Sequence, residues 1–158
     1  MKRRMMVAAA AGMILVGVVF GAAQATSPDI GHWSAKTDRT RDMTGDLTIT
    51  PGMLTIYQSK FPLARVRKLT PAETGAVFDA DTNARIGGDL YRLHVPPGVY
   101  YTGGDLLCGR EVIRWMATYV SGRTLQVAFF SGDDAPVFTF DAVSNSTAMC
   151  GMYIFSRD

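Results

Sequence analysis

The sequence predicts an all-β domain folded as a small antiparallel β-barrel of about eight strands, with a two-sheet sandwich as the alternative. Three observations predict this fold class. Short runs of alternating apolar and polar residues recur from residue 46 onward, which is typical of strands with one buried face. Proline, glycine, asparagine and aspartate separate these runs. No segment of ten or more residues after residue 25 shows the 3.6-residue period of an amphipathic helix.

The first three strands are expected to form a meander, at residues 46–50, 53–58 and 61–69. The first of them alternates leucine or isoleucine with threonine, and Pro51-Gly52 supplies a turn into the second. Strands that follow one another so closely usually pair. Before them, Trp33 lies in a polar segment and is expected to close one end of the core.

Residues 70–89 interrupt the pattern with Pro71, three glycines and several acidic residues. The longest loop is expected here, with one helical turn near Pro71. A strand at 90–95 follows, and its alternation places the apolar side chains inward and Arg92 and His94 outward.

The longest run, residues 111–120, and the run at 124–131 are expected to form a second hairpin around Ser121-Gly122-Arg123. Short runs at 136–140 and 151–155 complete the strands. Alternation places four side chains of the longest run on one face, namely Ile113, Trp115, Ala117 and Tyr119.

The N-terminal segment 1–25 has the order of a secretory signal peptide, because Lys2, Arg3 and Arg4 precede an apolar run that ends in Ala23-Gln24-Ala25. We therefore expect a signal helix at 1–25, a single domain at 26–158 and a periplasmic or secreted location. An uncleaved membrane anchor is the alternative, since the run approaches the roughly 20 residues of a spanning helix. The paired arginines also leave twin-arginine export open.

Removing the signal changes the charge of the chain. The signal holds three of the 16 basic side chains and none of the 14 acidic ones, so the segment 26–158 holds 13 basic and 14 acidic side chains. This balance argues against nucleic acid as a partner, and membrane contact is expected only through the signal segment before cleavage. Arg65, Arg67 and Lys68 form a small cluster, for which a solvated strand face is the simpler interpretation and an anion site the alternative.

The chain has two cysteines, Cys108 and Cys150, and in an exported protein such a pair predicts one disulfide. It would close a loop of 42 residues and stabilise the fold by roughly 4 kcal/mol on the chain-entropy model. We expect it to join the segment before the 111–120 strand to the start of the last strand across the barrel seam. Two buried free thiols are the alternative.

No sequence motif assigns a catalytic residue, a metal or a cofactor, since G-x-S-x-G, P-loop, dinucleotide-binding and H-E-x-x-H patterns are all missing. Asp79, Asp81 and Asn83 resemble the start of a calcium loop, but the glycine and glutamate that such a loop needs are missing, so an Asx-rich surface loop is favoured. By residue type, His94 is the best candidate for a general base, and an exposed structural histidine is the simpler interpretation.

Two sets of side chains are candidates for binding. One set could line an internal cavity for an apolar ligand, although filling the core is the simpler interpretation; it comprises Trp115, Tyr119, Phe129 and Tyr153, with Phe138 and Phe155. The other set lies in two loops whose composition suits protein recognition, although ordinary hairpin connections share it; it comprises Tyr100, Tyr101, Asp133 and Asp134.

Several segments with a TGD…LCG pattern resemble a group of small, uncharacterised exported proteins of proteobacteria. The segments are MTGDLTI at 43–49, LYRL at 90–93, LCG at 107–109, FFSG at 129–132 and CGMY at 150–153. This resemblance implies export, a disulfide and a β-rich fold, and it implies no catalytic residues. Gly31-His32-Trp33 and the strand with Trp115 also resemble secreted β-barrel inhibitors of proteases, which place a cysteine early in the mature chain where this sequence has none.

We therefore expect a non-enzymatic periplasmic or secreted protein that binds an envelope or extracellular protein through its loops, as a hydrolase inhibitor or an envelope accessory protein. The alternative is a lipocalin-like carrier of a small apolar ligand. An enzyme whose site has no recognisable motif is the third class. A packed barrel interior would favour the first function, and an open interior the second.

Overall fold

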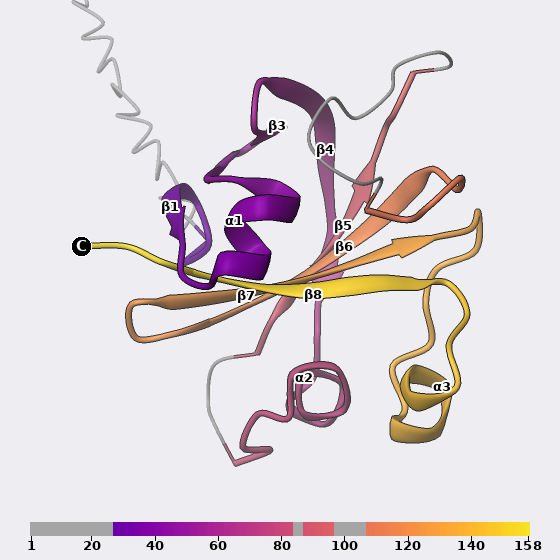
Figure 1. Ribbon diagram of the computed structural model, residues 1–158. Coiled ribbons are helices and arrows are strands. Elements are labelled where there is room, and N and C mark those ends of the chain that lie inside the picture. Colours follow the sequence, from indigo (N-terminus) through magenta and orange to yellow (C-terminus); the bar gives the residue numbers. More distant parts are fainter. Residues whose placement is uncertain (1–26, 84–86, 97–106) are drawn as a thin grey trace, which may run out of the picture.

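The computed structural model describes residues 27–83, 87–96 and 107–158, and in them eight strands form one closed antiparallel barrel (Figure 1). The predicted barrel is confirmed, and the sandwich is not formed. The expected signal peptide lies outside the described residues. The strands are β1 (Gly31–Ala35), β2 (Leu47–Thr50), β3 (Met53–Ile56), β4 (Ser59–Lys68), β5 (Asp89–Leu93), β6 (Ile113–Ser121), β7 (Thr124–Ser131) and β8 (Met149–Ser156).

Both predicted hairpins are present. β2 and β3 pair up to Thr50↔Met53, around the Pro51-Gly52 turn, and β4 continues the meander. β6 and β7 pair up to Ser121↔Thr124, where Gly122 takes a positive φ of 58° that a residue with a side chain adopts at a cost.

The barrel closes through β1, a strand that the alternation pattern did not predict. Its first three residues pair with β2, from Gly31↔Ile49 to Trp33↔Leu47, and its last two pair with β8, at Ser34↔Ser156 and Ala35↔Phe155. One short strand therefore holds both neighbours by dividing its length between them, which leaves too few residues on either side for a periodic pattern.

Three short helices also form, and no helix in the described part of the chain is long and apolar enough to cross a membrane. The helices are α1 (Asp38–Thr44), α2 (Pro71–Phe78) and α3 (Phe140–Ser144). A threonine caps the N-terminus of each, at Thr37, Thr70 and Thr139, by accepting a backbone hydrogen bond. The expected helical turn near Pro71 is an eight-residue helix, and the expected strand at 136–140 is wrong, because that segment is a loop leading into α3.

The barrel wall carries a core on each side. The interior core contains the inward side chains of all eight strands, among them Trp33, Ile113 and Phe129. An outer core on β5, β6 and β7 contains Trp115, Ala117 and Tyr119, with residues of α2 and of the segment before α3. The expected single face for Ile113, Trp115, Ala117 and Tyr119 is therefore wrong.

A β-bulge separates these side chains. Ile113 pairs with Ser131 while Trp115 pairs with Phe130, so β6 has an extra residue, Arg114, at this point. An extra residue reverses the side of the sheet to which later side chains point. Trp115 and Tyr119 consequently lie outside the barrel, in the outer core with residues of α2 and of the segment before α3.

Two glycines allow the chain to return from α2 to β5. A Cβ atom on Gly87 would lie 2.3 Å from the Leu69 carbonyl oxygen, and one on Gly88 would lie 2.1 Å from the Thr118 carbonyl oxygen. No other residue fits such a close backbone approach. These glycines therefore position α2 against the outer core.

Ion pairs explain the basic cluster of β4. Arg67 donates two hydrogen bonds of 2.8 Å to the Glu73 carboxylate on α2, and Arg65 donates to the buried Asp89 carboxylate with its Nε at 2.9 Å. Glu73 also accepts a hydrogen bond from the backbone nitrogen of Thr70, which completes a capping box. Arg67 thus links α2 to β4, and Arg65 links β5 to β4. Both arginines make structural ion pairs, and this explains them without an anion site.

The Arg67–Glu73 contact makes a pH-dependent contribution to stability. The guanidinium of Arg67 lowers the pKa of Glu73 from 4.5 to about 2. Because the folded-state pKa is depressed, the stabilisation is complete above about pH 4.5 and is lost as the pH falls toward about 2. In a double-mutant cycle of Glu73→Gln and Arg67→Gln, we expect a coupling energy of about 0.5–1 kcal/mol at pH 7. Urea unfolding at several pH values checks this, and a coupling energy that is constant down to pH 2.5 would contradict it.

Candidate functional site

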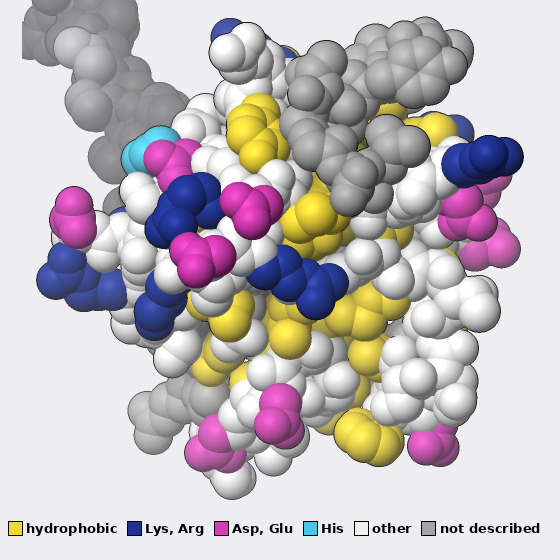
Figure 2. Space-filling view, in the orientation of Figure 1, with side chains coloured by type: hydrophobic (Ala, Val, Ile, Leu, Met, Phe, Trp, Pro, Cys, Tyr) yellow, Lys and Arg dark blue, Asp and Glu magenta, His cyan; other side chains and the backbone are white. Residues whose placement is uncertain are grey.

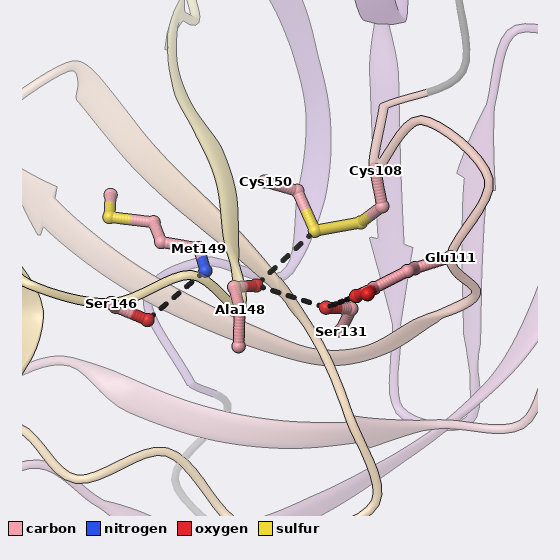
Figure 3. The surroundings of a disulfide bond; sticks show 7 residues. All are labelled: Cys108, Glu111, Ser131, Ser146, Ala148, Met149 and Cys150. Carbon is pink, nitrogen blue, oxygen red and sulfur yellow. Dashed lines mark hydrogen bonds between the residues drawn. A yellow bond between two sulfur atoms is a disulfide. The ribbon is translucent and has the colours of Figure 1, made fainter.

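The disulfide Cys108–Cys150 is present, as predicted (Figure 3). Its Cα atoms are 4.6 Å apart, and it joins the segment before β6 to the start of β8. We expected the bond to lie across the barrel seam, and this expectation is wrong. The bond spans the end of β7, because β7 lies between β6 and β8. The bond therefore fixes the end of the barrel from which the β7–α3 loop emerges.

Hydrogen bonds around the disulfide hold the same end of the barrel. The Ser131 hydroxyl donates to the Glu111 carboxylate (Figure 3), and the Ser131 backbone nitrogen donates to the Ala148 carbonyl oxygen at 2.8 Å. The Met149 backbone nitrogen donates to the Ser146 hydroxyl at 3.2 Å. Ser131 thus links the segment before β6 to the one before β8, and both the beginning and the end of the segment 132–148 are fixed.

The base of the β7–α3 loop is anchored by Trp115. Its Nε1 donates to the Gly132 carbonyl oxygen at 3.2 Å, and the guanidinium of Arg92 stacks on its ring at 4.4 Å. Arg92 in turn donates to the Asp133 carbonyl oxygen at 3.0 Å. The loop is therefore held at its first two residues by side chains of β5 and β6.

Beyond this base, the segment 134–143 has one buried aromatic side chain, Phe138, between two exposed apolar ones, Val137 and Phe140. Phe138 is buried in the outer core, where its ring meets Phe130 edge-on at 5.7 Å. Val137 is 67% exposed and Phe140 is 74% exposed, the two most exposed of the large apolar side chains described. Figure 2 shows hydrophobic side chains at the surface around α3 and between α2 and α3.

A hollow of about 310 Å³ lies between this loop and α3. Two acidic residues, Asp133 and Asp134, border the hollow, and a third, Asp141, lies nearby in the first turn of α3. We call the exposed parts of residues 133–143 the loop–α3 surface. The lining of the hollow includes Ser131, Asp134, Pro136, Val137, Val143 and Ala148. An apolar centre with an acidic rim is the composition of many protein-binding surfaces.

The structure divides the candidate ligand-lining residues between the two cores. Phe129, Tyr153 and Phe155 lie together inside the barrel, where the rings of Phe129 and Tyr153 are 6.0 Å apart. The other three, Trp115, Tyr119 and Phe138, lie in the outer core. No common cavity can therefore be lined by all of them.

The interior is packed around these residues. Ten apolar side chains of the interior core have no exposed area, so no water-sized space adjoins them: Trp33, Leu47, Ile49, Leu54, Ile56, Met116, Leu125, Val127, Phe129 and Phe155. Close packing of this kind is the normal state of a protein core. The interior side chains described here thus fill the barrel.

The other predicted site residues have ordinary surroundings. Asp133 and Asp134 are exposed at the loop after β7, whereas Tyr100 and Tyr101 lie outside the described residues. His94 is exposed on the outer wall, as expected. In the supposed calcium loop, the Asp81 carboxylate accepts two hydrogen bonds from Asn83, at 2.9 and 3.0 Å, which is an Asx turn.

One buried polar group was not predicted. The Asp29 side chain, in the segment before β1, accepts hydrogen bonds from the hydroxyls of Tyr91 at 2.8 Å and Thr118 at 2.7 Å, and the residue is only 1% exposed. Its backbone carbonyl accepts a further bond from Nε1 of Trp33 at 2.8 Å. Burial, and next the charge of Asp29, raise the pKa of Tyr91 far above its usual value. The contact ties the segment before β1 to β5 and β6.

Comparison with known proteins gives no relative. The chain matches no family model, no curated protein and no solved structure.

Proposed function

We propose that this chain is a non-enzymatic exported protein that binds an envelope or extracellular protein through the loop–α3 surface, as a hydrolase inhibitor or an envelope accessory protein. The observation that carries this proposal is the exposure of Val137 and Phe140 on a segment whose base is fixed. Exposed apolar side chains that lie near one another mark interaction sites more often than chance. A fixed loop also loses little conformational entropy on binding.

The location rests on two features. A disulfide is stable in an oxidising compartment such as the periplasm or the extracellular space. The order of the N-terminal segment 1–25 fits a cleaved signal peptide. Together they support a partner outside the cytoplasm.

The packed interior weighs against the alternative of a lipocalin-like carrier. A carrier of this type needs a cavity of about 300 Å³ or more inside the barrel for an apolar ligand. The large interior side chains Trp33, Phe129 and Phe155 have no exposed area. Native mass spectrometry of the exported protein provides an independent check, because a bound lipid or metabolite would contradict the proposal.

Site-specific photo-crosslinking in exporting cells tests the surface directly. We expect crosslinkers placed at Val137 and Phe140 to give the same discrete protein adduct. The matched control is Val66, an apolar residue of β4 that is 51% exposed, which should not give that adduct. With the captured protein in hand, Val137→Ser with Phe140→Ser should weaken binding at least about tenfold. Equal adducts from all three positions, or undiminished binding by the double variant, would contradict the proposal.

A further inference from the structure

A second hollow, separate from the loop–α3 surface, lies on the outer wall over β4, β5 and β6. Its volume is about 190 Å³. β4 contributes two small side chains to its border, Pro62 and Ala64. Ala64 pairs with Arg92 of β5. Its lining includes Pro62, Leu63, Ala64, Arg92, His94 and Arg114. Both charged side chains in this set, Arg92 and Arg114, are cationic.

The two arginines are brought together by the bulge in β6. Arg114 is the extra residue of that bulge, between Ile113 and Trp115. Arg92 lies on β5 directly opposite Trp115, on whose ring its guanidinium stacks. A bulge redirects a side chain without interrupting the sheet, and here it places the second guanidinium beside the first.

Only one carboxylate among the described residues lies within 4.0 Å of either guanidinium. It belongs to Asp133, whose Oδ1 is 3.7 Å from Nη2 of Arg92 and 3.6 Å from Nε of Arg114. These distances are too long for hydrogen bonds. The Asp133 side chain is also 86% exposed, whereas each arginine side chain is 33% exposed. By contrast, three other arginines, Arg41, Arg65 and Arg67, have charge-assisted bonds of 2.5–2.9 Å to carboxylates.

We propose that the hollow formed by Arg92 and Arg114 binds the carboxylate of a ligand, and that Asp133 occupies its rim as an internal substitute. Two adjacent guanidiniums present paired N–H donors that match the two oxygens of a carboxylate. Nη1 of Arg92 donates to the Asp133 carbonyl oxygen, but the loose contact of the Asp133 carboxylate leaves Nη2 of Arg92 and Nε of Arg114 available for a shorter bond. The site uses none of the apolar side chains of the loop–α3 surface, with which it shares only Asp133, and the two hollows have no lining residue in common.

The test is a titration of the exported, disulfide-bonded protein, labelled with ¹⁵N at arginine. Citrate serves as a free carboxylate, and the peptide acetyl-Glu-Glu-amide as a protein-like one. We expect the Nε–Hε signals of Arg92 and Arg114 to shift and the signal of Arg123 to stay in place. Arg123 serves as the exposed control: its side chain is 71% exposed, its carboxylate contact with Asp158 is 4.0 Å long, and its Nε donates to the Arg157 carbonyl oxygen at 3.0 Å.

Variants decide whether the arginines and Asp133 have the proposed roles. Arg114→Gln should weaken carboxylate binding about tenfold, whereas Arg123→Gln should leave it unchanged. Asp133→Asn should strengthen binding about fivefold, because it removes the competing carboxylate. This gain cannot arise from misfolding. No gain from Asp133→Asn, or equal losses from Arg114→Gln and Arg123→Gln, would overturn the proposal.

Two further comparisons identify the source of the carboxylate and separate this proposal from the previous one. Tighter binding of the peptide supports a partner protein as the source, and tighter binding of citrate supports a free small acid. Val137→Ser with Phe140→Ser should leave both affinities unchanged. A loss of carboxylate binding in that double variant would overturn the independence of the two sites.

Discussion

Replacing Trp33 by alanine is expected to lower the free energy of unfolding by about 3–5 kcal/mol. The side chain has no exposed area, lies in the interior core, and donates a hydrogen bond of 2.8 Å to the Asp29 carbonyl oxygen. The guanidinium of Arg157 also stacks on its ring at 4.4 Å. Alanine would leave a large cavity in the interior core and remove the hydrogen bond to the Asp29 carbonyl oxygen.

Urea unfolding of the disulfide-bonded protein measures this effect, and two milder variants divide it. Trp33→Phe keeps an aromatic ring and removes the N–H group, so about 1–3 kcal/mol is expected to be lost. Arg157→Gln removes the stacked cation and should lower stability by about 0.5–1 kcal/mol. A loss for Trp33→Ala of less than about 1.5 kcal/mol, well under the usual cost of truncating a buried tryptophan, would show that Trp33 does not support the core as described.

Removing the disulfide is expected to have the second-largest effect. Replacing Cys108 and Cys150 together by serine should lower the free energy of unfolding by about 2–4 kcal/mol, because the unfolded chain regains the freedom of a 42-residue loop. The unfolding midpoint in urea measures this loss. A reductant should destabilise the parent protein by a similar amount and should not affect the double variant, which is the control.

The location of the disulfide adds a local effect to the global one. It holds the segment before β6 against the start of β8, at the base from which residues 132–148 emerge. The double variant should therefore bind the partner captured at Val137 more weakly than its loss of global stability explains. Unchanged stability after reduction would contradict the global effect, and unchanged binding by the double variant would contradict the local one.

The sequence predicted the barrel because most of its strands alternate. The hairpins β2–β3 and β6–β7 carry long alternating runs with turn residues between them, and these are strong local signals. α1 and α3 escaped notice, and α2 was expected only as a single turn, because none of the three exceeds eight residues, which is too short for a helical period to be visible. Residues 136–140 resembled a strand because of Val137, Phe138 and Thr139, although Thr139 instead caps α3.

The sites were less predictable than the fold, since they depend on contacts between distant segments. The loop with Asp133 and Asp134 could be recognised by composition, but the anchoring of its base requires the pairing of β5 with β6. The bulge at Arg114 leaves no local signal, and it decides both the side on which Trp115 lies and the neighbour of Arg92. Asp29 stands in an ordinary polar segment, and only the closed barrel surrounds it with Tyr91 and Thr118.

The course of β8 gives the molecule a polarity along the barrel axis. Its last residues lie beside the first described segment, where Arg157 donates to the Pro28 carbonyl oxygen at 3.3 Å, while its start adjoins the disulfide. Eight residues of strand, about 25 Å, separate these two ends. Both ends of the described chain thus emerge opposite α3 (Figure 1). If the protein were attached to another structure through either end, the loop–α3 surface would face away from the point of attachment.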